Sequence, residues 1–68
     1  MKGAYKIIEL VGSSKTSWEE AASHAIETAG KSVRDIRVAE VQELDMKVDN
    51  GKVQSYRVRL KVSFKLEH

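Results

Sequence analysis

The chain has 68 residues, 41% of them hydrophobic, and its twelve Lys and Arg against ten Asp and Glu leave a formal charge of only +2. This length excludes a second domain, and the absence of cysteine excludes disulfides and thiolate-bound metal. The near balance of charge indicates a protein that does not bind nucleic acid. No segment approaches the roughly 18 apolar residues of a membrane-spanning helix, so we expect a cytoplasmic protein with no membrane partner.

The first predicted element is a strand, AYKIIELV, over residues 4–11, because this segment is rich in β-branched and aromatic side chains and ends at Gly12. Its apolar side chains lie on both faces: Ile7 and Val11 on one, Ile8 and Leu10 on the other. A single helix covers only one face of a sheet. The other face therefore predicts burial against further copies of the chain, as expected for so small a domain.

A helix is predicted next, because the apolar spacing changes to three and four residues. Its apolar stripe consists of Trp18, Ala21, Ala22, Ala25, Ile26 and Ala29. Most of these are alanine, which predicts a close approach of the helix to the sheet. Ser17 and Glu20 form a Ser-x-x-Glu capping box at its start, and Gly30 is expected at its end.

Two strand-like runs, residues 35–48 and 52–66, flank Asn50 and Gly51, which favour the positive φ angles of a two-residue hairpin turn. With Asp49 opposite Lys52, we expect one uniform register. The face toward the helix would then pair Ala39 with Val62, Val41 with Leu60, Glu43 with Val58 and Asp45 with Tyr56. The opposite face would pair Val38 with Ser63, Glu40 with Lys61, Gln42 with Arg59 and Leu44 with Arg57.

The predicted fold is α+β, in the order β-α-β-β, with a three-stranded antiparallel sheet wrapped on one helix and the first strand paired with the last. Residues 1–66 are expected to form this single domain. The closing Glu67 and His68 are compatible with a native end or with the start of a vector-encoded tag.

Catalytic machinery is not visible in the sequence. His24 lies on the polar face of the helix, the second histidine is the terminal His68, and no Ser/His/Asp or Cys/His set can be assembled. We therefore expect no catalytic residues and no enzymatic activity.

Acidic side chains near the hairpin supply the hard oxygen ligands that calcium prefers. The candidate metal ligands are Asp45, Asp49 and Glu43. They do not follow the spacing of an EF-hand loop, and the alternative is that they are ordinary surface carboxylates.

The stretches VGSSKTSWEEAASHAIETA and VSFKLE resemble the dodecin family, and the resemblance extends over essentially the full chain. It implies a β-α-β-β subunit that assembles with itself into a hollow homododecamer. Most dodecins bind flavins, and they stack the ring on a tryptophan of the second strand and hydrogen-bond it through a glutamine of the third. The resemblance places Val38 and Arg57 at these two positions. Because both residue types have changed, flavin is not expected as a cofactor.

The pattern TSWE, DIRVA and VSFK looks most like a tryptophan-less branch described as calcium dodecins. We therefore expect a non-enzymatic shell protein that binds a small ligand or metal ion, calcium first, in a storage role. The alternative is a dodecin that sequesters riboflavin or FMN in a modified pocket formed by Val38, Arg57 and Gln42. A third possibility is a structural assembly that binds nothing specific.

Overall fold

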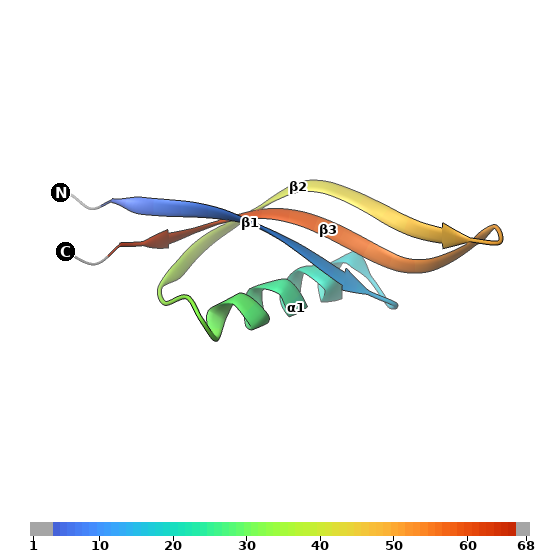
Figure 1. Cartoon of the computed structure of the whole chain (residues 1–68), viewed down its shortest axis with the longest axis horizontal. Coiled ribbons are helices and arrows are strands. Elements are labelled where there is room, and N and C mark those ends of the chain that lie inside the picture. Colours follow the sequence, from blue (N-terminus) through green and yellow to red (C-terminus); the bar gives the residue numbers. More distant parts are fainter. Residues whose placement is uncertain (1–3, 67–68) are drawn as a thin grey trace.

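The computed structural model describes residues 4–66, and its elements follow the predicted order (Figure 1). They are β1 (Tyr5–Ser14), α1 (Trp18–Gly30), β2 (Ile36–Asp49) and β3 (Lys52–Lys65). The strands form one antiparallel sheet in the order β1-β3-β2, so the first strand pairs with the last. The predicted β-α-β-β fold is confirmed. Glu67 and His68, including the possible tag, lie outside the described residues.

Helix α1 lies along one face of the sheet, beneath β1 and β3 in Figure 1, and the core lies between them. The buried apolar residues are Ala21 and Ala25 of α1 with Val58, Leu60 and Val62 of β3. Partly buried side chains pack around them, among them Ile8 and Leu10 of β1 and Ile26 of α1. Within the described part of the chain, no helix has both the length and the apolar character needed to cross a membrane.

Gly12 allows α1 to pack directly against β1. The sequence predicted that this strand ends at Gly12, but it continues through Gly12 to Ser14. A Cβ atom placed on Gly12 would lie 2.1 Å from the carbonyl oxygen of Ala21 and 2.9 Å from the Cβ of Ala25. The close approach predicted from the alanine stripe is therefore present, and it requires a strand residue without a side chain.

The start of α1 is fixed by a small polar turn. The Oγ of Ser17 accepts a hydrogen bond from the backbone N–H of Glu20 at 3.0 Å, as the capping box predicts. The carboxylate of Glu20 does not return to Ser17; its Oε1 accepts from the hydroxyl of the buried Ser14 at 2.6 Å. This bond from Ser14, with a further one from Thr16, holds the pKa of Glu20 below its usual range. The carboxylate thus connects the end of β1 to the helix.

The β2–β3 hairpin has the predicted turn, because Asn50 and Gly51 both have positive φ angles, 54° and 70°. Its register is not uniform. Asp49 pairs with Lys52, but the register shifts between Lys47 and Val48 and shifts back between Val41 and Glu43. A third shift lies between Ile36 and Val38, at the start of β2. Beyond the second shift four predicted pairs are confirmed: Ala39 with Val62, Val41 with Leu60, Val38 with Ser63 and Glu40 with Lys61.

Between the two shifts the predicted pairs are wrong. The structure pairs Glu43 with Arg59, Leu44 with Val58, Asp45 with Arg57 and Met46 with Tyr56. Gln42 is the extra residue at one shift, so it does not lie opposite Arg59, and as in a β-bulge it reverses the alternation of the residues that follow. The physical reason is that the uniform register would turn two carboxylates toward the helix, where burial of their charge is costly.

We predict that Gly12→Ala destabilises the fold by about 1–3 kcal/mol or more, because the new methyl group overlaps the helix backbone and forces α1 away from β1. Chemical denaturation measures the loss. Gly30→Ala is the matched control, since nothing lies within 4 Å of a Cβ at Gly30, and alanine favours a helix by up to about 1 kcal/mol. Unchanged stability of the Gly12 variant would show that the helix is not seated as described.

Candidate functional site

The face of the sheet opposite α1, here called the outer face, holds the residues that alternate with the buried positions of β3. Across it, the middle strand β3 carries three cations and a serine, and the two outer strands carry acids, apolar residues and a serine. The rows that run from β1 through β3 to β2 are Ile7, Ser63, Val38; Glu9, Lys61, Glu40; Val11, Arg59, Glu43; and Ser13, Arg57, Asp45. Charges of both signs therefore lie side by side, between apolar residues.

Two of these rows contain ion pairs between β3 and β2. The Nε and Nη2 atoms of Arg57 donate to the two carboxylate oxygens of Asp45 at 2.7 and 2.9 Å, in a fork geometry. Arg59 Nη1 donates to Glu43 Oε1 at 3.2 Å. The bonds from Arg57 hold the pKa of Asp45 below its usual range. The stabilisation by this pair is therefore present at neutral pH and is lost as the pH falls through the lowered folded-state pKa.

Apolar side chains are exposed on both faces of the sheet. On the outer face, Ile7, Val11 and Val38 are each 60% or 61% exposed. On the helix side, α1 does not cover β2, and Val41 and Leu44 are each more than half exposed. Exposed apolar side chains grouped in this way are typical of surfaces that contact other molecules.

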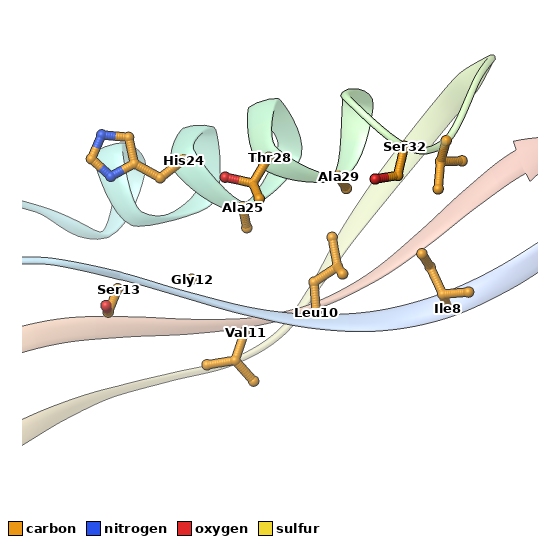
Figure 2. Close-up of a pocket in the computed structure, with 11 residues that line it drawn as sticks. Ile8, Leu10, Val11, Gly12, Ser13, His24, Ala25, Thr28, Ala29 and Ser32 are labelled. Atoms are coloured by element: carbon orange, nitrogen blue, oxygen red, sulfur yellow. The ribbon is translucent and has the colours of Figure 1, made fainter.

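An open groove of about 470 Å³ lies between α1 and β1. Figure 2 shows Ile8 and Leu10 pointing from β1 toward the helix, while Val11 points away from it to the outer face. Ala25 and Ala29 form much of the opposite wall, and the exposed His24 lies on the same helix. None of the flavin-pocket or metal residues predicted from the sequence lines this groove, so it is separate from the candidate site.

The three flavin-pocket positions do not meet within one chain. Val38 lies opposite Ser63, and Arg57 lies six residues from Ser63 along β3, which corresponds to roughly 20 Å at the rise of a strand. Gln42 lies at the bulge between them. The guanidinium of Arg57 is also occupied by Asp45. A pocket built from both Val38 and Arg57 therefore requires two chains.

The predicted metal ligands are also separated. Glu43 and Asp45 share the outer face, contrary to the prediction that they lie on the helix side, and each is paired with an arginine. Asp49 lies at the end of β2, at the hairpin turn. Residues 4–66 contain no group of three or more His, Asp or Glu side chains that could hold a metal ion. One chain thus falls short of the six to eight oxygens that calcium takes.

Besides the two ion pairs, the sequence did not predict a contact of Trp18 with β2. The indole Nε1 of Trp18, the first residue of α1, donates to the backbone carbonyl of Asp45 at 3.0 Å. Its ring meets the ring of Tyr56 edge-on, with centroids 5.0 Å apart. The helical spacing placed Trp18 on the apolar stripe, but nothing in that spacing signals a partner 27 residues away whose position depends on the register shift.

The comparisons with known proteins agree on one family. The model of the dodecin family matches residues 4–67. Calcium dodecin of Mycobacterium tuberculosis is 53% identical over 62 residues, which cover 91% of this chain and 87% of that protein. Its crystal structure, described as that of a calcium-chelating antigen with a novel calcium-binding site, has a TM-score of 0.84 at 54% identity and covers 94% of this chain and 91% of its own.

Two further dodecins are similar over nearly the whole chain. The dodecin of Thermus thermophilus is 37% identical over 67 residues, which cover 98% of this chain and 97% of that protein. The structure of the dodecin from Streptomyces davaonensis has a TM-score of 0.94 and covers 100% of both chains. Its identity is 24%, so it supports the fold alone.

Proposed function

The chain belongs to the dodecin family, and we propose that it is a binding and storage protein, not an enzyme, whose copies form a hollow homododecamer associated with calcium. The observation that carries the choice of calcium is the 53% identity to a relative named calcium dodecin. The cytoplasmic location expected from the sequence stays a prediction.

Assembly is supported by the apolar residues that a single chain leaves exposed. Ile7, Val11 and Val38 on the outer face and Val41 and Leu44 on the helix side have no cover from α1. A second copy packed on the outer face would bury apolar side chains and could match the cations of β3 with acids of the neighbouring chain. Assembly therefore satisfies both the apolar and the charged parts of this face.

Ligand binding is proposed at the contacts between copies. Within one chain the candidate carboxylates are tied to arginines or lie at the hairpin turn, and the flavin-pocket positions are far apart. Side chains from two or more copies could complete an oxygen-rich site that one chain lacks. In this proposal Asp45, Glu43 and Asp49 would supply oxygens, and calcium would supply positive charge that holds neighbouring copies together.

We predict that calcium binds to chelator-treated protein. Calorimetric titration should give a saturable heat, and millimolar calcium should raise the melting temperature, because a ligand at a hundredfold excess over its Kd stabilises by about 2.7 kcal/mol. Asp45→Asn should weaken binding. Glu40→Gln, which alters an outer-face carboxylate that is not a candidate ligand, should bind like the unaltered protein. Absence of both heat and thermal shift in the unaltered protein would remove calcium from the proposal.

The rival function is flavin sequestration in a modified pocket, in which Arg57 would bind a flavin phosphate. The ion pair of Arg57 with Asp45 argues against it, because the guanidinium is already occupied. If the rival were correct, the purified protein would be yellow or would quench added riboflavin. A purely structural assembly would respond to neither calcium nor flavin.

We predict that Val38→Trp combined with Arg57→Gln creates measurable flavin binding. The tryptophan restores an aromatic stacking surface, worth about 0.5–1.5 kcal/mol beyond area burial, and the glutamine restores a hydrogen-bonding side chain. Riboflavin fluorescence should be quenched by the double variant and less so by Val38→Trp alone. Unquenched riboflavin with the assembled double variant would mean that the pocket has been placed at the wrong residues.

A further inference from the structure

Asp45 accepts hydrogen bonds from two different elements, β3 and α1. On the outer face its carboxylate accepts two hydrogen bonds from Arg57, at 2.7 and 2.9 Å. Its backbone carbonyl accepts the indole N–H of Trp18, the first residue of α1, at 3.0 Å. The neighbouring pair, Arg59 with Glu43, is a single bond of 3.2 Å, and no side-chain bond to the carbonyl of Glu43 is seen among residues 4–66.

The contact of Trp18 lies at a structurally special place. Trp18 begins α1 directly after its N-cap Ser17, and its ring meets Tyr56, the neighbour of Arg57 on β3. Asp45 lies in the segment of β2 whose register is shifted. Within the described residues, the bond from Trp18 is the only side-chain hydrogen bond that joins α1 to β2. The indole therefore links the helix start to both strands of the hairpin.

We propose that Trp18 is a positioning residue for the outer face: its indole N–H fixes the backbone of Asp45, which directs the carboxylate to Arg57, and so couples this ion pair to the start of α1. The carbonyl of Asp45 contacts Trp18 and its side chain contacts Arg57. Because both groups belong to one residue, a shift of either contact moves the other. An outer-face ligand that separates Asp45 from Arg57 would then change the environment of Trp18. That last step rests on the proposed function; the positioning itself does not.

The competing interpretation is that Trp18 only contributes apolar packing at the edge of the core. In that case its ring contact with Tyr56 would matter for stability, and the indole N–H would be indifferent to the outer face. The two interpretations differ in what happens when the ion pair is removed and the packing is left intact.

The first experiment removes the ion pair and observes the tryptophan. Because the chain has a single tryptophan, its indole N–H gives one NMR resonance. Arg57→Met should shift this resonance, whereas the matched control Arg59→Met, which removes the neighbouring ion pair, should leave it in place. An unmoved resonance in the Arg57 variant, or equal shifts in both variants, would overturn the proposal. Both arginines are about half exposed, so neither substitution should prevent folding.

The second experiment runs in the opposite direction. Trp18→Phe keeps an aromatic ring against Tyr56 but removes the donor to Asp45. Exchange of the Arg57 Nε–H with water should become roughly two- to tenfold faster, the range expected for loss of one supporting hydrogen bond. Unchanged exchange would contradict the positioning role. If this variant fails to fold, the comparison of the Arg57 and Arg59 variants still decides.

Calcium is the probe for the coupling to a ligand. Calorimetry reports whether calcium binds, and the indole resonance in the same titration reports whether Trp18 responds. Binding with a shifted resonance supports the coupling, and binding without a shift overturns it and leaves the proposed function intact. Absence of binding removes calcium from the proposed function, and the positioning role is then decided by the arginine variants.

Discussion

A helix of thirteen residues covers only part of a sheet whose strands reach fourteen residues, and the rest of the structure depends on this mismatch. The helix is about 20 Å long and the longer strands about 46 Å, within a molecule that extends 52 Å. Gly12 and the facing alanines bring α1 tightly onto β1 and β3, so that a small core forms there. The outer face, most of β2 and the hairpin remain uncovered.

The candidate site residues lie on the surface that α1 leaves uncovered, and in the described part of the chain they do not converge. Val38 and Arg57 lie far apart on the outer face, and the carboxylates of Glu43 and Asp45 are neutralised by arginines of the same chain. Within residues 4–66 of one subunit, Val38 and Arg57 do not meet, and no group of three or more His, Asp or Glu side chains could hold a metal ion. In the proposed assembly, contacts between copies would provide both the missing cover and the missing ligands, so that binding would depend on oligomerisation.

Most of the fold was predictable from local patterns in the sequence. A run rich in β-branched and aromatic residues identified β1, alternation identified β2, three- and four-residue spacing identified α1, and Asn50 with Gly51 identified the turn. The bulge at Gln42 was not predicted, although it changes the phase of the alternation: the apolar residues facing the helix side are Ala39 and Val41 before it and Leu44 and Met46 after it. The uniform register placed Glu43 and Asp45 toward the helix, and this was a sign that the register was wrong there, because charged side chains avoid such positions.

The contacts that depend on the bulge at Gln42 could not be predicted without it. The ion pairs of Arg57 and Arg59 and the bond from Trp18 to Asp45 all lie in the segment between the register shift at Gln42 and the shift between Lys47 and Val48. Sequence alone can list the charged residues of a hairpin, but their partners follow from pairing that long-range packing decides. The separation of the predicted site residues is likewise a property of the sheet and not of any local motif.

The central claim is that the exposed outer face is covered by further copies of the chain. Light scattering coupled to gel filtration, at micromolar concentration and near-physiological salt, measures this directly. We expect a single species with twelve times the mass of the 7.6 kDa chain. A stable monomer under these conditions would contradict it, because the apolar residues of the outer face would then be tolerated in water without a partner.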